Sequence, residues 1–135
     1  MKEIVLQTRA REDMVSITRQ VQDIVAAEGW KNGAVLVFCV HTTAAVTINE
    51  NADPDVCRDM ARGLSRISPR LAEFRHSEGN SDAHIKSSIV GASELVPVEN
   101  GKLCLGTWQG LWFCDFDGPR QRRVLVQWLG QESAV

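Results

Sequence analysis

The chain has 135 residues, of which 44% are hydrophobic and 24% are charged, and its formal net charge is −2. These values are typical of one globular domain, spanning residues 1–135, with a core that needs no metal or disulfide to hold it together. The small negative charge argues against a nucleic-acid partner, and no apolar stretch approaches the roughly eighteen residues of a membrane span. Because the N-terminus also lacks the apolar segment of a signal peptide, we expect a cytoplasmic protein.

The first third of the chain reads as a strand, a helix and two further strands. Alternating apolar residues predict the strand over 2–8. Helical spacing of apolar residues predicts the helix over 17–30, with Thr18 as its N-cap. Residues 34–41 and 43–49 read as strands, and the first of these is apolar on both faces, which is typical of a central strand.

A second helix is indicated over residues 53–67. Asp53 suits its N-cap and Pro54 its first turn, while a proline at position 69 ends it. The spacing of its apolar residues predicts one buried stripe. That stripe consists of Val56, Met60, Leu64 and Ile67.

The remaining chain predicts one short helix and then only strands. The helix covers 82–91, with Ile85 and Ile89 on its inner face. A hairpin turns at Asn100-Gly101, and two strands follow over 110–116 and 122–129. About seven strands and three helices, with the helices in the first two-thirds, predict an α+β fold built on a mostly antiparallel β-sandwich.

The three histidines are the first candidates for chemistry. His41, His76 and His84 lie in separate segments, and each has polar neighbours. Neutral imidazole is the commonest protein donor to zinc, so three histidines that converge would form a site for a divalent metal, zinc or magnesium. A single histidine is more often structural than a ligand, and no HExxH motif is present, so both interpretations stay open.

A carboxylate and several cations are the second group of candidates. Glu50 ends a predicted strand nine residues after His41, where it would serve as a general base or as a solvated turn residue. Lys86, Arg120 and Arg123 would neutralise a phosphate, which arginine grips with two donors. Hydroxyl groups of threonine and serine would complete such a site. The candidates are Thr42, Thr43, Ser87 and Ser88.

Three long stretches, read together, resemble one family. They are "HTTAAVTINENADPDV" at 41–56, "GNSDAHIKSSIVG" at 79–91 and "VENGKLCLGTWQGLWFCDFDGPRQRRVLVQ" at 98–127. These motifs resemble the YjbQ-like proteins, named for a secondary thiamine-phosphate synthase activity, and the resemblance covers residues 16–129. It implies a compact α+β homotrimer with a polar pocket built from the motifs.

The resemblance also implies site residues and an activity. His41, Glu50 and His84 belong to the implied pocket as catalytic residues, and His76 adds a third metal ligand from a less well matched loop. The implied reaction joins a hydroxymethylpyrimidine diphosphate to a thiazole phosphate. Polar residues inside the motifs are the implied substrate contacts. They are Thr42, Thr43, Asn49, Asn80, Lys86, Ser87, Thr107, Gln109, Arg120 and Arg123.

Two classes of function remain as alternatives. As an enzyme, the chain would stabilise departing pyrophosphate with its cations, or act as a metal-assisted hydrolase. As a binding module, it would hold a phosphorylated small molecule or a metal without turning it over. The ordinary thiamine-phosphate synthase is a (β/α)8 barrel, which typically needs about 200 residues or more, so any such activity must come from an unrelated site.

Overall fold

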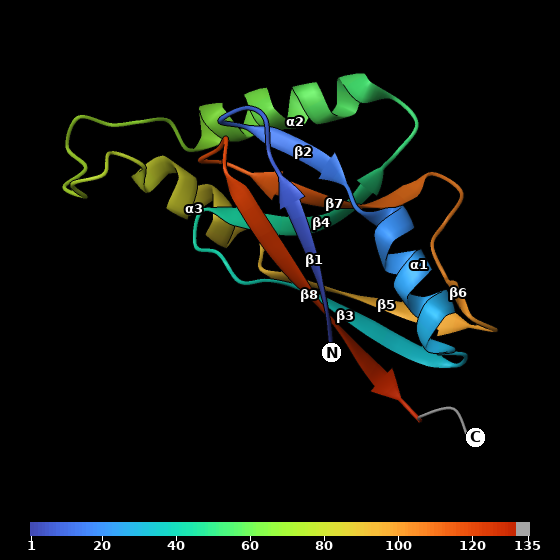
Figure 1. Ribbon diagram of the computed structural model, residues 1–135. Helices are drawn as coiled ribbons and strands as arrows, with labels where there is room; N and C mark the ends of the chain where they lie inside the picture. Colours follow the sequence, from blue (N-terminus) through green and yellow to red (C-terminus); the bar gives the residue numbers. More distant parts are fainter. Residues whose placement is uncertain (132–135) are drawn as a thin grey trace.

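The computed structural model describes residues 1–131 as two antiparallel sheets with three helices (Figure 1). The five-stranded sheet has the order β1-β8-β3-β5-β6, and the three-stranded sheet has the order β2-β7-β4. The strands are β1 (Lys2–Gln7), β2 (Asp13–Ser16), β3 (Gly33–Cys39), β4 (Ala44–Glu50), β5 (Ser93–Glu99), β6 (Lys102–Leu103), β7 (Gln109–Asp115) and β8 (Gln121–Gly130). The helices are α1 (Thr18–Glu28), α2 (Pro54–Ile67) and α3 (Ser81–Val90). The predicted α+β class with an antiparallel sandwich is confirmed, with eight strands where about seven were expected.

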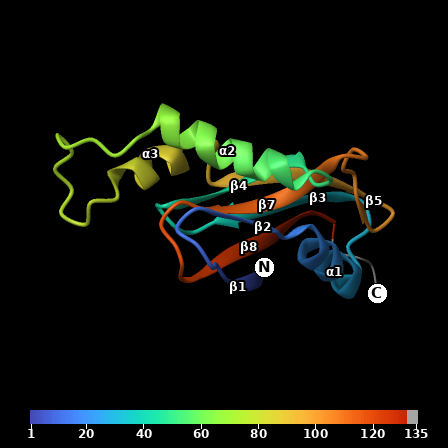
Figure 2. The ribbon, with the colours of Figure 1, turned by 90° about the horizontal axis from the view of Figure 1, so that it is seen from above.

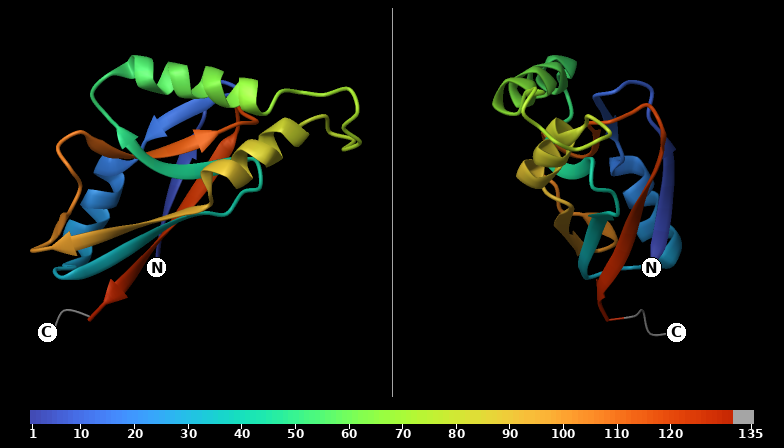
Figure 3. Two further views of the ribbon diagram at one scale, coloured as in Figure 1. Left: turned by 180° about the vertical axis from the view of Figure 1, so that it is seen from behind. Right: turned by 90° about the vertical axis from the view of Figure 1, so that its left-hand side faces the viewer.

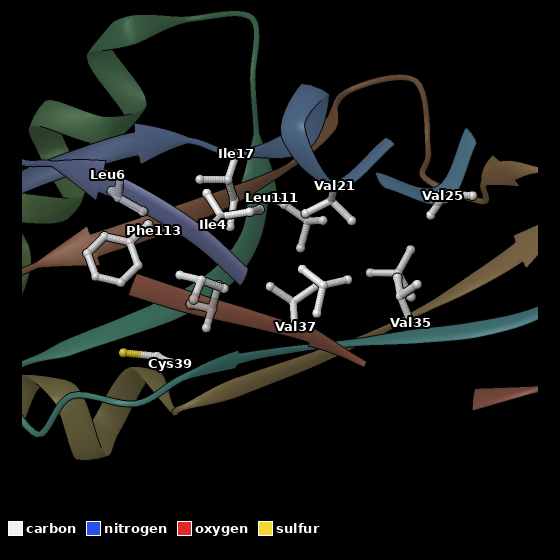
Figure 4. Close-up of a cluster of buried hydrophobic side chains, with 14 of the residues drawn as sticks. Ile4, Leu6, Ile17, Val21, Val25, Val35, Val37, Cys39, Leu111 and Phe113 are labelled. Carbon is white, nitrogen blue, oxygen red and sulfur yellow. The ribbon is translucent and has the colours of Figure 1, made fainter. Parts of the chain in front are cut away.

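The main core lies between the two sheets (Figures 3 and 4). Alternate residues of each strand point inward, as in β8, where Val124 and Val126 are buried and Arg123 is exposed. Helix α1 closes one end of this layer by burying Val21 and Val25. The apolar residues that alternate along the strands and those that recur at helical spacing in α1 therefore belong to one core.

Helix α1 is shorter than the predicted range of 17–30, and its N-cap is not the predicted one. Its N-cap is Ile17, and the hydroxyl of Thr18 instead accepts a 2.8 Å hydrogen bond from the backbone N–H of Leu111 in β7. The helix ends at Gly29, which adopts the left-handed conformation with φ 67°. Thr18 thus ties α1 to the three-stranded sheet rather than capping the helix.

Helix α2 begins where the sequence predicts but buries less than expected. The Asp53 side chain accepts a hydrogen bond from the backbone N–H of Asp55, which confirms the cap. The helix lies over the outer face of the three-stranded sheet (Figure 2), where Leu64 packs against a small cluster with Phe116. The predicted stripe is only half-buried at Val56, Met60 and Leu64, and Ile67 is exposed, so its burial was overestimated.

Helix α3 reverses the expected burial. Its inner face carries four small or polar residues: Asp82, Ala83, Lys86 and Ser87. Ile85 and Ile89, predicted to face inward, are exposed instead. Ion pairs neutralise the buried charges on this face: Lys86 pairs with Glu12 and Asp82, and Arg11 also pairs with Asp82. The spacing of apolar residues therefore did not decide which face of α3 is buried.

The final hairpin agrees with its turn signal. Asn100 and Gly101 both have positive φ angles, 51° and 76°, as a two-residue turn between β5 and β6 requires. Strand β2 was not predicted, because four residues with little alternation give a weak signal. Within residues 1–131, no helix is long and apolar enough to cross a membrane.

Candidate functional site

A polar cleft opens where the β3–β4 connection, the start of α3 and the β7–β8 connection meet. Its volume is about 290 Å³. Of the predicted site residues, it brings together His41, Thr42, Thr43, Asn80, His84 and Arg120. Val40, Glu78, Asp117 and Arg122 complete its lining.

A buried ion pair forms the floor of the cleft. Arg122 is 3% exposed and grips Asp115 with two hydrogen bonds, of 3.0 Å from Nε and 2.7 Å from the guanidinium nitrogen. The same guanidinium donates to the hydroxyl of Thr43 at 2.9 Å, and Thr8 donates to Asp115 at 2.7 Å. Burial alone would raise the pKa of Asp115, but these hydrogen bonds and the charge of Arg122 hold it below its ordinary value.

His41 is held as a neutral ring in one tautomer. Its Nε2 accepts a 2.9 Å hydrogen bond from the backbone N–H of Arg123, so the ring proton lies on Nδ1. Burial and the nearby charge of Arg122 lower the pKa of His41 below its ordinary value. In this tautomer Nε2 is engaged by the backbone, and Nδ1–H is the remaining polar group of the His41 ring.

His84 is the cleft histidine whose ring remains available for proton transfer. Neither of its ring nitrogens has a hydrogen-bond partner among residues 1–131. His76 lies against it edge to face, with ring centroids 5.2 Å apart. The Nε2 of His76 lies 3.9 Å from the Glu78 carboxylate.

Asn80 and Asp117 join α3 to the β7–β8 connection. The amide nitrogen of Asn80 donates to the Asp117 carboxylate at 2.6 Å and to Glu78 at 3.4 Å. Asp117 also pairs at 3.3 Å with Arg120, whose side chain is 53% exposed. Arg120 is thus the solvent-exposed cation of the cleft lining, while the other arginine of the lining, Arg122, is buried.

The three-histidine metal site does not form within one chain. His76 and His84 adjoin each other, and His84 shares the cleft with His41. However, residues 1–131 contain no group of three or more His, Cys, Asp or Glu side chains that could hold a metal ion. One ring nitrogen of His41 is also engaged by the backbone. The donor set therefore does not fit a resident zinc or magnesium.

A second group of predicted site residues lies at the other end of β4. Glu50 pairs with Gln109 across the sheet, and Asn49 contacts Met60 of α2. Thr107 lies in the adjoining turn and Gln109 begins β7, where its side chain accepts a 2.8 Å hydrogen bond from the backbone N–H of Gly106. A strand of seven residues spans about 20 Å, so one chain does not bring Glu50 and His41 together.

Lys86 lies outside the cleft, in a network of its own. It is 1% exposed and donates to Glu12 at 2.7 Å and to Asp82 at 3.4 Å. Arg11 grips the same Asp82 with two bonds of 3.1 and 3.2 Å. Burial alone would raise the pKa of Asp82, but Arg11 and Lys86 hold it below its ordinary value.

Ser87 and Arg123 also differ from their expected positions. The Ser87 hydroxyl donates a 2.6 Å hydrogen bond to the backbone of Ala44, which fixes α3 to β4. Arg123 lies on the outer face of β8 and pairs with Glu3 at 3.0 Å. Its side chain borders a neighbouring hollow that also includes His41.

Sequence reasoning missed the ion pair beneath the cleft. Arg122 shares the alternation of Val124 and Val126, and Asp115 shares that of Leu111 and Phe113. The sequence did contain a signal for this pair: one acid and one base occupy positions that the alternation of their strands assigns to the core. A charge that faces the core requires a partner of opposite charge, so the two residues could have been paired. Glu78 and Asp117 carried no comparable signal.

Comparison with known proteins places the chain in a family. The model of the "UPF0047 protein YjbQ-like" family matches residues 2–131. The UPF0047 protein YugU of Bacillus subtilis is 51% identical over 131 residues, which are 96% of this chain and 99% of that protein. A UPF0047 protein of Archaeoglobus fulgidus is 41% identical and covers 93% of this chain and 98% of its own.

Solved structures agree with this assignment. An uncharacterized conserved protein of the YjbQ/UPF0047 family from Clostridium acetobutylicum superposes with a TM-score of 0.93 at 48% identity, over 96% of this chain and 100% of that one. A conserved hypothetical protein from Thermus thermophilus gives 0.88 at 41% identity, over 96% and 100% of the two chains. The chain therefore belongs to the YjbQ-like UPF0047 family.

Proposed function

We propose that the cleft at His41 binds a phosphorylated small molecule through its phosphate. The observation that carries this proposal is the meeting of a half-exposed cation, Arg120, with the Nδ1–H donor of His41 in one polar cleft. The exposed hydroxyl of Thr42 lies beside them. Charge-assisted and neutral donors that converge on one hollow are the usual means of holding phosphate oxygens.

The reaction that we propose is transfer of a pyrimidine from its diphosphate to a thiazole phosphate, as a secondary thiamine-phosphate synthase activity. This reaction requires stabilisation of the departing pyrophosphate, which Arg120 and the neutral ring of His41 supply without a metal. The thiazole nitrogen bonds the methylene carbon of the pyrimidine as the bond from that carbon to the pyrophosphate oxygen breaks. His84, with free ring nitrogens, is the group that donates a proton to that departing oxygen and regains one from water. Because Glu50 lies at the far end of β4, the reaction does not use it as a base within one chain.

The distance between Glu50 and the cleft favours a second candidate, a binding module without turnover. The two candidates differ at His84. An enzyme requires its ring for proton transfer, so His84→Asn would abolish turnover and leave affinity for pyrophosphate within about twofold of the original. A binding module would show no turnover before or after that change.

The test combines calorimetric titration with an assay for thiamine phosphate. Arg120→Gln should weaken binding of hydroxymethylpyrimidine diphosphate by roughly tenfold or more, because a hydrogen bond to a charged group contributes about 1.5–3 kcal/mol. Arg19→Gln, an exposed arginine on α1, is the matched control and should change nothing. Equal affinities for the two variants would contradict the proposal.

We also propose that copies of the chain associate as a homotrimer through the outer face of the five-stranded sheet. That face carries four exposed apolar side chains: Val5, Phe38, Leu95 and Leu129. An apolar face of this kind usually marks an association surface. The hollow that includes Val5 also includes His41, so the surface continues to the edge of the cleft. Light scattering should give three chains per particle, and Leu95→Lys should lower that number; a monomer would contradict the proposal.

A further inference from the structure

A second hollow lies beneath helix α2, apart from the His41 cleft. The helix covers the outer face of the three-stranded sheet (Figure 2), and residues of both line a space of about 380 Å³. This hollow and the His41 cleft have no lining residue in common. Because no residue of α2 is fully buried, the helix leaves part of its inner face uncovered.

The inner lining of this hollow is apolar. Met14 of β2 and Ala61 and Leu64 of α2 line it, and all three are only half-buried, so they keep apolar surface open to the hollow. Phe116 also lines it and packs in one cluster with Met14 and Leu64. Apolar surface with a few polar groups is the usual lining of a small-molecule site.

Two arginines without acidic partners complete the lining on the α2 side. Arg58 and Arg62 have i, i+4 spacing, which places them on one side of the helix. Both are exposed, and neither forms an ion pair or a side-chain hydrogen bond among residues 1–131. An anion at this side of the hollow would therefore meet two available guanidinium groups.

Three acids also line the hollow, but two of them are already paired with cations. Glu12 accepts from Lys86 at 2.7 Å, and Asp115 accepts from Arg122 at 3.0 and 2.7 Å. Within residues 1–131, only Asp13 has no cationic partner. The unpaired charges are thus two guanidinium groups and one carboxylate, which favours an anionic ligand.

We propose that the hollow beneath α2 is a second binding site, which takes a medium-chain carboxylate. The apolar chain of the ligand lies on Met14, Ala61 and Leu64, and its carboxylate lies against Arg58 and Arg62. Arginine binds a carboxylate with two donors, and burial of the chain supplies the free energy that exposed charge pairs alone do not. This site does not depend on the function proposed for the His41 cleft.

The probes are octanoate, butyrate and 1-octanol, each titrated into the isotope-labelled full chain and followed by backbone amide shifts. Octanoate should shift Ala61 and Leu64, and it should bind more tightly than butyrate by up to about fourfold for each added methylene group. 1-Octanol has the chain without the charge, so it should bind roughly tenfold more weakly than octanoate. No octanoate shifts beneath α2, or equal affinities for octanoate and 1-octanol, would overturn the inference.

The double variant Arg58→Gln with Arg62→Gln separates the contribution of the charge from that of the chain. It should weaken octanoate binding roughly tenfold and leave 1-octanol within about twofold. Arg66→Gln removes another exposed arginine of α2 that does not line the hollow, so it is the matched control and should change neither affinity. An equal loss in Arg66→Gln would indicate a general effect of charge and would overturn the inference.

Ala61→Met tests the hollow without changing its charge. The longer side chain fills part of the space, so octanoate and 1-octanol should both bind more weakly, while pyrophosphate binding at the His41 cleft stays the same. Unchanged octanoate affinity in Ala61→Met would contradict the proposed site. If octanoate does not bind and the double arginine variant instead lowers the particle mass in light scattering, the hollow is a contact between copies of the chain and the inference is wrong.

Discussion

Two of the three predicted catalytic residues, His41 and Glu50, lie toward opposite ends of β4, and only the His41 end is built as a site. At the start of the strand, His41 lies beside a cleft whose floor is a buried Arg122–Asp115 pair. The other end of β4, which leads into α2 on the side away from α3 in Figure 1, carries Glu50 paired with Gln109. Among residues 1–131, no buried ion pair supports these two side chains. Both ends contain the same kinds of residue, but the first holds them in fixed orientations.

The comparison teaches that buried charge orients the functional side chains. The Arg122 guanidinium fixes Thr43, and the backbone N–H of the next residue along β8 fixes the ring of His41. Each contact removes rotational freedom before a ligand arrives, which lowers the entropic cost of binding. A substitution in this support should therefore affect folding more than a substitution at the Glu50 end.

The largest effect is expected from Arg122→Met. Removing the guanidinium leaves Asp115 as an uncompensated buried charge, which should lower the free energy of unfolding by about 3–5 kcal/mol. Urea denaturation measures this change. Arg123→Met, which removes only an exposed pair with Glu3, is the control and should cost less than about 1 kcal/mol. Similar losses in both variants would show that the buried Arg122–Asp115 pair supports the fold no more than an exposed pair does.

A smaller loss is expected from Lys86→Met, which lies outside both ends of β4. Glu12 loses its partner, while Asp82 retains Arg11, so the free energy of unfolding should fall by about 1.5–3 kcal/mol. Affinity for pyrophosphate should stay unchanged, because Lys86 does not line the His41 cleft. A tenfold loss of pyrophosphate affinity in a folded Lys86→Met protein would show that the phosphate site includes this lysine.

The pH dependence of stability should reveal the environment of His41. Its pKa in the folded chain lies below the ordinary value of 6.5, so the unfolded chain binds more protons as the pH falls below that value. The stabilisation is complete above pH 6.5 and is lost as the pH falls through the lower, folded pKa. Urea denaturation at several pH values should therefore show that the free energy of unfolding falls as the pH falls below 6.5, and that it falls less in His41→Asn. The same fall in both proteins would contradict the environment assigned to His41.

The smallest effect is expected from Glu50→Gln. The Glu50 side chain makes no ion pair or hydrogen bond among residues 1–131, so the free energy of unfolding should change by less than about 0.5 kcal/mol. Pyrophosphate affinity should also remain the same. A strong loss of affinity in an intact homotrimer would mean that Glu50 of one copy reaches the cleft of another.

The fold was predictable where local signals decide it. Asp53 with Pro54 marked the start of α2, and Asn100-Gly101 marked the last hairpin, because caps and turns depend on neighbouring residues. The buried faces of the helices were not predictable in this way. Ile85 faces outward and Lys86 inward because ion pairs from distant segments satisfy the lysine, and apolar spacing contains no information about them.

The candidate site was also predictable only in part. His41, Asn80 and His84 belong to motifs named from the sequence, and the structure brings them into one cleft. Their separation from Glu50 depends on the length and direction of β4, which a motif match does not show. The side-chain position of Asn80 depends on its hydrogen bond to Asp117, 37 residues away.

The most direct test of the phosphate cleft is to map pyrophosphate onto both ends of β4 by nuclear magnetic resonance. Backbone amide shifts would be followed during a titration of the isotope-labelled chain. The account predicts shifts at Thr42, Asn80 and Arg123, around the cleft, and none at Asn49 or Glu50. Shifts centred on Asn49 and Glu50, with none around His41, would contradict it.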